Sequence, residues 1–188
     1  MRQHSWIRVG AAAFSALALF ALGAVPQDTQ TVDAGGMKFQ APKDWKSTPP
    51  KSAMRKAELS VPSAAGDKDT GLLAVFALSG GAGGVTANLE RWQGMFKDPT
   101  GNVPKLEPKT IKSKSGVSIT RVEFAGTYTE PTFGQGAPTP KPDYRLLGAI
   151  VETSQTSYFL RMTGPDKTIK GAAGAFDKVL DSIEVGGK

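Results

Sequence analysis

The strongest constraint on the fold is an apolar run over residues 72–78, LLAVFAL, in which no position is polar. A strand that faces solvent on one side alternates apolar and polar residues, whereas a strand buried on both faces is apolar throughout. The run therefore predicts a central strand of a sheet that is covered on each side. A second run, residues 144–152 (YRLLGAIVE), is almost as apolar and predicts another central strand.

Two helices are expected to provide this cover. The first follows the glycine-rich stretch 79–84 (SGGAGG) and extends over residues 85–97. The second begins at Gly164-Pro165, because proline is favoured at the first position of a helix. Each helix has an apolar face with helical spacing. These faces are Val85, Leu89, Trp92 and Phe96 in the first helix, and Ile169, Ala172, Phe176, Leu180 and Ile183 in the second.

Further strands are expected at residues 37–40, 54–61, 105–113, 117–128 and 157–163. Turns of hairpin length separate most of them, which favours antiparallel pairing. Within 117–128 the apolar positions change phase, so we expect a β-bulge near Thr120-Arg121. The predicted fold class is α+β, a largely antiparallel sheet of about six or seven strands with a helix on each face, which is an α/β/α sandwich.

Residues 1–24 have the order of regions that is typical of a secretory signal peptide. A basic start with Arg2 and Arg8 precedes an apolar stretch, and small residues that suit cleavage end it. The alternative is an uncleaved N-terminal anchor, although the apolar stretch is shorter than the roughly 20 residues that span a bilayer. We expect an exported protein, periplasmic or extracellular, that meets the membrane only through this segment before cleavage. A polar, flexible leader at 25–36 and a single domain at 37–188 would follow.

The chemistry of the chain is limited by the residues that it lacks. It has no cysteine, and its single histidine, His4, lies in the predicted signal peptide. A Ser-His-Asp or Cys-His nucleophile needs one of these side chains, and so does an ordinary zinc, copper or haem site. We therefore expect no cofactor, no metal site and no disulfide.

The net charge argues against a nucleic-acid partner. It is +6 for the whole chain, and it falls to +4 when Arg2 and Arg8 leave with the signal peptide. The basic residues are spread along the chain and mixed with acids, whereas nucleic-acid binding proteins cluster them. We expect a monomer whose partner is an unknown envelope protein or a small ligand.

Four segments resemble an uncharacterised group of exported bacterial proteins: APKDW (41–45), SAMRKAELSVP (52–62), GGAGGVTANLERW (80–92) and KPDYRLLGAIVE (141–152). The expected order of strands and helices also resembles the Mog1/PsbP-like fold over most of the mature chain. That fold class includes photosystem II extrinsic proteins, a small-GTPase-binding protein and periplasmic proteins of the DcrB type. The resemblance implies an accessory or binding role, and it transfers no functional residue because a fold does not fix a function.

The glycines before the first expected helix are one candidate site: Gly80, Gly81, Gly83 and Gly84. Backbone N–H groups at a helix N-terminus can bind an anion, and glycines allow close approach. The Lys-Ser/Thr of a P-loop is absent, which argues against a nucleotide site. The alternative is a strand-to-helix connection that binds nothing.

Arginines are the second candidate site. Arg55 lies on an alternating strand and either faces solvent or contacts a ligand. Arg145 and Arg161 lie in strands that should be buried or half-buried, where a guanidinium needs an acceptor. Each is either part of a structural ion pair or a cation that faces a substrate. The acids that could serve are Asp143, Glu123 and Glu152.

These observations favour an exported, non-catalytic binding or accessory protein. The first alternative is a carrier of a small molecule or lipid, with a pocket between sheet and helix near Gly80–Gly84 and the Pro/Gly-rich loop 130–143. The second alternative is a hydrolase that uses two carboxyl groups. The acids available for that role are Glu58, Glu90, Glu107, Glu123, Glu130 and Glu152.

Overall fold

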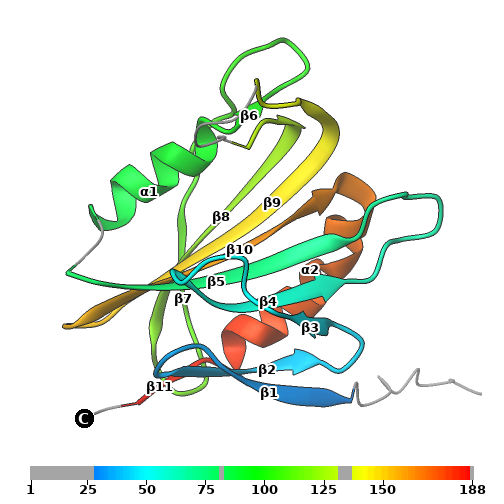
Figure 1. Ribbon diagram of the computed structural model, residues 1–188. Coiled ribbons are helices and arrows are strands. Elements are labelled where there is room, and N and C mark those ends of the chain that lie inside the picture. The colour runs from blue at the N-terminus through cyan, green and yellow to red at the C-terminus, as the bar shows by residue number, and fades with distance from the viewer. Residues whose placement is uncertain (1–27, 81–82, 131–136, 187–188) are drawn as a thin grey trace, which may run out of the picture.

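The computed structural model describes residues 28–80, 83–130 and 137–186 (Figure 1). Its strands are β1 (Thr29–Asp33), β2 (Met37–Pro42), β3 (Lys46–Thr48), β4 (Arg55–Val61), β5 (Gly71–Ser79), β6 (Phe96–Lys97), β7 (Lys109–Lys112), β8 (Ser118–Tyr128), β9 (Lys141–Glu152), β10 (Thr156–Pro165) and β11 (Glu184–Val185). Its helices are α1 (Gly84–Gln93) and α2 (Asp166–Asp181). The predicted signal peptide lies outside the described residues. Within them, no helix is both long and apolar enough to cross a membrane.

The two apolar runs lie in the middle of the main sheet, as the sequence predicts. β5 and β9 both pair with β10 in an eight-stranded sheet of order β3-β4-β5-β10-β9-β8-β6, and β7 also pairs with β8. Every one of these pairings is antiparallel. Helix α1 lies on one face of the sheet and α2 on the other (Figure 1). The predicted α+β class is therefore confirmed, with a strand number slightly above the expected one.

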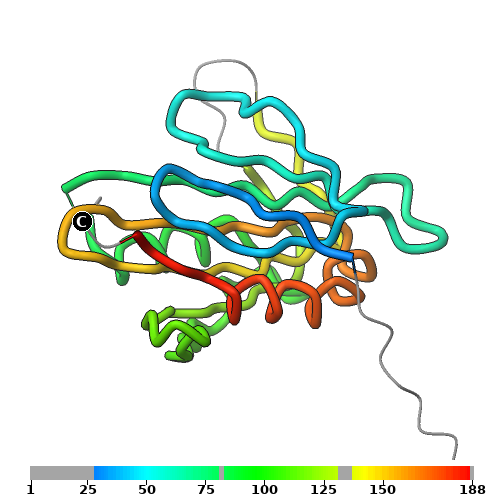
Figure 2. The backbone as a smooth tube through the Cα atoms, turned by 90° about the horizontal axis from the view of Figure 1, so that it is seen from below, coloured from blue at the N-terminus to red at the C-terminus, as the bar shows by residue number. Residues whose placement is uncertain are grey.

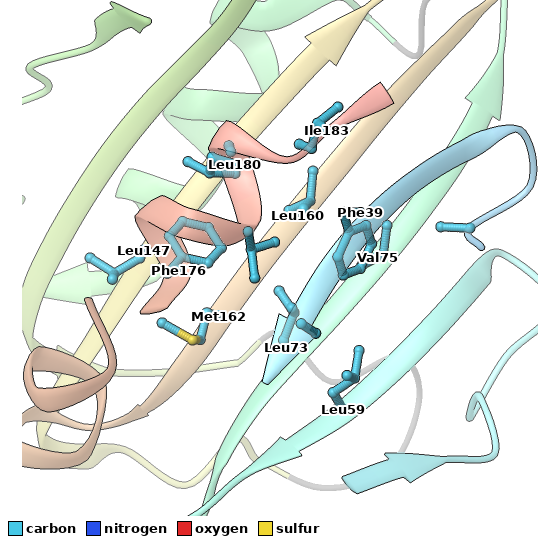
Figure 3. Close-up of a cluster of buried hydrophobic side chains, with 14 of the residues drawn as sticks. Phe39, Leu59, Leu73, Val75, Leu147, Leu160, Met162, Phe176, Leu180 and Ile183 are labelled. Atoms are coloured by element: carbon cyan, nitrogen blue, oxygen red, sulfur yellow. The ribbon is translucent and has the colours of Figure 1, made fainter. Parts of the chain in front are cut away.

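Side chains of the central strands alternate between two apolar clusters, one on each face. The larger cluster lies under α2 and includes Leu73, Leu147 and Phe176 (Figure 3). The smaller one lies under α1 and includes Leu89, Trp92 and Leu146. Consecutive residues of β9, such as Leu146 and Leu147, thus belong to different apolar clusters. This is why residues 144–152 are apolar at successive positions.

A second, three-stranded sheet of order β1-β2-β11 also packs on the α2 face. Figures 1 and 2 show the β1–β2 hairpin beside the C-terminal end of α2, where β11 pairs with β2. The range 25–36, expected to be a flexible leader, therefore contains a strand, and that expectation is wrong from Thr29 onward. The residues of β1 alternate between exposed and half-buried. Because β1 is a polar edge strand, it carries no apolar pattern that the sequence could reveal.

The β-bulge expected near Thr120-Arg121 is absent, since the register of β8 with β9 is regular from Ile119 to Gly126. Ile119 belongs to the cluster under α2, whereas Val122 belongs to the cluster under α1. The change of apolar phase therefore reflects a strand that is covered on both faces. The irregularity lies at Gly126, where a Cβ would collide with the carbonyl oxygen of Lys97.

Helix α1 ends earlier than the apolar spacing predicts. The backbone amide of Gly94 closes the last turn on the Glu90 carbonyl, and the chain then enters β6. Phe96 is fully buried in the same cluster as Trp92, but it arrives there from a strand that pairs with Tyr128. The helical spacing therefore identified a buried residue and assigned it to the wrong element.

Candidate functional site

Helix α1 is held on the sheet by Trp92, whose ring lies over Gly148 of β9 and packs edge-on against Phe159 of β10. The Trp92 and Phe159 ring centroids are 6.3 Å apart at an interplanar angle of 84°. A Cβ at Gly148 would lie 2.5 Å from Cζ3 of Trp92. The close approach of helix to sheet at this point therefore requires glycine.

The helix covers only part of its face of the sheet. The ten residues of α1 make a helix about 15 Å long and about 10–12 Å wide. The main sheet has seven strands side by side along its order, which makes it roughly 30 Å wide. Part of β5 and β10 beside α1 is not covered by the helix. A groove with a volume of about 460 Å³ lies there, between α1 and residues 52–55.

Most of the surface that lines the groove is apolar, although six of its twelve side chains are polar and three of those are arginines. Phe76 and Leu78 of β5 and Phe159 of β10 contribute from the sheet. Met54 is 60 % exposed, which makes it one of the two most exposed large apolar side chains in the part of the chain that the structure describes. Apolar surface left in water costs about 25 cal/mol per Å², so an open apolar groove favours binding. The remaining lining residues are Ser52, Arg55, Asn88, Arg91, Trp92, Met95, Glu130 and Arg161.

Two of the arginines stack on the ring of Phe76. The guanidinium carbon of Arg55 lies 5.5 Å from the ring centroid, and that of Arg161 lies 5.9 Å from it. Each is also paired with a carboxylate. Arg55 Nη1 lies 2.5 Å from Glu58 Oε1, and Arg161 Nη2 lies 2.9 Å from Glu130 Oε1.

Glu58 is a structural counter-ion. Its burial alone would raise its pKa, but the Lys51 amide and the Arg55 guanidinium donate hydrogen bonds to it and bring the pKa below 4.5. The pKa of Asp98 is likewise lowered, by hydrogen bonds from Thr100 and Asn102, and that of Glu107 by its contact with Lys105. A glycosidase acid needs a raised pKa, so these three acids give the hydrolase hypothesis no support.

A second, more polar hollow of about 290 Å³ adjoins the groove, because Glu130 and Arg161 line both. Tyr128 and Tyr144 stack there with ring centroids 5.9 Å apart, and Tyr144 donates a 2.8 Å hydrogen bond to Asp69. Desolvation raises the pKa of both tyrosines to about 12, so their hydroxyls stay protonated at neutral pH. The other lining residues are Thr70, Leu72, Ala74, Lys141, Thr163 and Gly164.

Of the candidate glycines, the three that the structure describes, Gly80, Gly83 and Gly84, do not line the groove. Gly80, Gly83 and Gly84 have φ of 78°, 85° and 79°, so they form a connection that favours glycine for its left-handed backbone. The carbonyl of Gly84 accepts a 2.7 Å hydrogen bond from the Asn88 side chain. Gly81 lies outside the described residues, as do residues 131–136 of the predicted Pro/Gly-rich loop. A ligand role for these glycines stays a prediction.

The candidate arginines are separated by the sheet. Arg55 lines the groove, whereas Arg145 lies on the opposite face and pairs with Glu123 and with Asp166, the latter at 2.8 Å. The pair with Glu123 is one that the sequence allowed, whereas Asp166 was not among the acids considered for Arg145. Arg161 pairs with Glu130, which was not among the acids considered for it.

The sequence predicted a pocket between sheet and helix, but not most of the residues that line the groove, because Phe76 and Leu78 looked like residues of a strand covered on both faces. The length of the helix was the available signal, since one short helix cannot cover a wide sheet. Among the described residues, no three or more His, Cys, Asp or Glu side chains are placed to hold a metal ion.

Comparisons with known proteins place the fold. No family model and no curated protein matches the sequence. The chain is similar to the solution structure of cyanobacterial PsbP (CyanoP) from Synechocystis sp. PCC 6803, with a TM-score of 0.53 and 12 % identity over 88 % of this chain and 96 % of that one. A crystal structure from Bacteroides thetaiotaomicron VPI-5482 has a TM-score of 0.52 and 12 % identity over 87 % of this chain.

This chain spans only half, 50 %, of the Bacteroides chain. A protein of unknown function from Pseudomonas aeruginosa has a TM-score of 0.47 and 11 % identity over 85 % of this chain and 99 % of that one. Identities this low show a fold and no more. The chain has the Mog1/PsbP-like fold.

Proposed function

We propose that the protein is an exported, non-catalytic binding protein that holds an apolar ligand in the groove between α1 and residues 52–55. The observation that carries the proposal is the groove itself, an apolar depression of about 460 Å³ that α1 is too short to cover. Ligand sites in proteins have volumes of about 300–1,000 Å³ and largely apolar walls. The volume and the largely apolar surface of this groove agree with both features.

A binding role fits the chemistry of the chain better than catalysis does. Neither histidine nor cysteine occurs after His4. The two carboxylates beside the groove, Glu58 and Glu130, are each paired with an arginine. Export is supported by the order of regions in residues 1–24, which is typical of a signal peptide.

The groove favours the small-molecule or lipid carrier among the binding roles. Its floor is a sheet, and its sides are a helix and residues 52–55, so it can enclose an alkyl chain or a ring on three sides. The other candidate occupant is an apolar side chain of an envelope protein. The experiment below distinguishes this protein partner from a small-molecule ligand.

Dye binding tests the proposal. The purified protein should enhance the fluorescence of 1-anilinonaphthalene-8-sulfonate, and 1-decanol should displace the dye. Leu78→Glu places a charge in the groove and should weaken dye binding by at least about tenfold, since burying an unpaired charge is costly. Val103→Glu is the matched control, because Val103 is 45 % exposed and does not line the groove.

Equal dye binding by both variants and the unchanged protein would contradict a ligand site in the groove. Absence of dye and decanol binding, together with specific capture of one envelope protein that Leu78→Glu abolishes, would instead assign the groove to a protein partner.

A further inference from the structure

The groove and the second hollow differ in chemistry and meet at one ion pair. The groove contains apolar side chains such as Phe76 and Phe159, whereas the hollow contains mostly polar groups such as Tyr144 and Lys141. The Arg161–Glu130 pair lines both. A ligand that extends from one to the other would therefore be apolar at one end and polar at the other, with the change of character at this pair.

The two members of the pair are held very differently. Arg161 is 11 % exposed and is fixed by a second contact from Nη1 to Met95 Sδ at 3.7 Å, besides stacking on Phe76. Glu130 is 54 % exposed, at the end of the described part that follows β8. An exposed ion pair contributes little to stability. The guanidinium is thus a fixed part of the site, and its present carboxylate can be exchanged for another at small cost.

The groove also carries positive charge that its own acids do not balance. Arg55 and Arg161 have carboxylate partners, but Arg91 donates only to the amide oxygen of Asn88, at 2.8 Å. Within the described ranges, no carboxylate lies within ion-pair distance of Arg91. An occupant with one negative charge complements this arrangement, whereas a cation is repelled by it.

We propose that the ligand is a single-chain amphiphile with a carboxylate or phosphate head group. The inference rests on the proposed function. The alkyl chain lies in the groove along Phe76 and Phe159. The acid takes the place of the Glu130 carboxylate on Arg161, where the planar fork of the guanidinium suits either anion. Arg91 supplies the remaining charge, and Glu130 acts as the internal competitor that sets the affinity for acids.

Calorimetric titration with three ligands of one chain length tests the proposal: decanoate, decyl phosphate and neutral 1-decanol. Glu130→Gln removes the competing carboxylate and should strengthen binding of both acids by about threefold to tenfold, without changing decanol. Arg161→Gln should weaken binding of both acids by about tenfold and spare decanol. Comparing the affinities for decanoate and decyl phosphate shows whether the site prefers a carboxylate or a phosphate head group.

Glu123→Gln is the matched control, because Glu123 is a half-exposed acid that pairs with arginines on the opposite face of the sheet. It should bind all three ligands like the unchanged protein. If Arg161→Gln does not fold, Glu130→Gln still tests the proposal, since the Glu130 side chain is 54 % exposed.

The outcomes separate the two proposals. If decanol binds and Glu130→Gln leaves the affinity for both acids unchanged, the acid head group is wrong and the apolar site stands. The same conclusion follows if Glu130→Gln strengthens decanol as much as the acids. If none of the three ligands binds the unchanged protein, the proposed function and this inference both fail.

Discussion

The ring of Trp92 lies directly over Gly148, so closely that a Cβ at residue 148 would lie 2.5 Å from the ring carbon Cζ3. This contact fixes where α1 sits on β9, and therefore where the groove beside α1 begins. Val122 closes the same space, since the added Cβ would lie 3.0 Å from its Cγ2 atom. The position of α1 thus depends on the absence of a side chain at residue 148.

We predict that Gly148→Ala lowers the free energy of unfolding by about 1–3 kcal/mol, the usual cost of overpacking a core. It should also weaken dye binding, because the helix must shift. Urea denaturation and dye titration measure the two effects. Gly171→Ala is the control, since Gly171 lies in α2 with open space around it and alanine there should stabilise the protein by about 0.5–1 kcal/mol. Equal stability of Gly148→Ala and the unchanged protein would show that α1 is not held by this contact.

The Arg55–Glu58 pair predicts a stability change with pH. The pKa of Glu58 is lowered in the folded protein, so its contribution to stability is present above about pH 4.5 and is lost as the pH falls through the folded value. Glu58→Gln should therefore cost about 1–3 kcal/mol at pH 7 and progressively less below pH 4.5. Urea denaturation across that range measures the difference, and a cost that stays constant with pH would contradict the assignment.

Arg145 is predicted to have a structural role only, whereas Arg55 and Arg161 also line the groove. It bridges Glu123 of β8 and Asp166 at the start of α2, on the face away from the groove. Arg145→Gln should lower the free energy of unfolding by about 1 kcal/mol, since its partners are more than a third exposed. Its dye and decanoate affinities should equal those of the unchanged protein. Reduced ligand binding with unchanged stability would instead indicate that Arg145 contributes to the binding site.

The N-terminal strand should contribute to stability although its sequence is polar. Val32 of β1 faces Phe39 of β2 in the pairing and packs against the cluster under α2. Deleting residues 28–33, which removes β1 and leaves Ala34 in the core, should lower the free energy of unfolding by about 1–2 kcal/mol, roughly the value of burying one valine side chain. Thermal denaturation of the shortened and full proteins tests this, and identical midpoints would mean that β1 is dispensable.

The residues of the proposed binding site were only partly predictable. Arg55 was a candidate, and the need of Arg161 for a carboxylate follows from its place in an apolar strand. Its partner, Glu130, could not be foreseen, because the neighbours of a strand end depend on the strand order. The glycines before α1 were a candidate ligand site, and the positive φ angles of Gly80, Gly83 and Gly84 give those three a reason in the turn that they make.

The sequence by itself determined the central strands, the two helices and the α+β class. Apolar runs and helical spacing record which residues are buried, and burial is the largest favourable term in folding. It also shows that no cysteine is present and that no histidine follows His4, so sites that need either side chain cannot be built from the later residues. It did not reveal β1, whose hydrogen bonds to β2 leave no apolar pattern.

Only the tertiary structure decided which faces meet. Phe76 and Phe159 are apolar residues of central strands and have the same local pattern as core residues. They line a groove because α1 is short and is held over β9 by the Trp92–Gly148 contact, which leaves β5 and β10 partly open. Side-chain alternation assigns a residue to a face of the sheet, but the extent of cover on that face depends on the length and position of a distant helix.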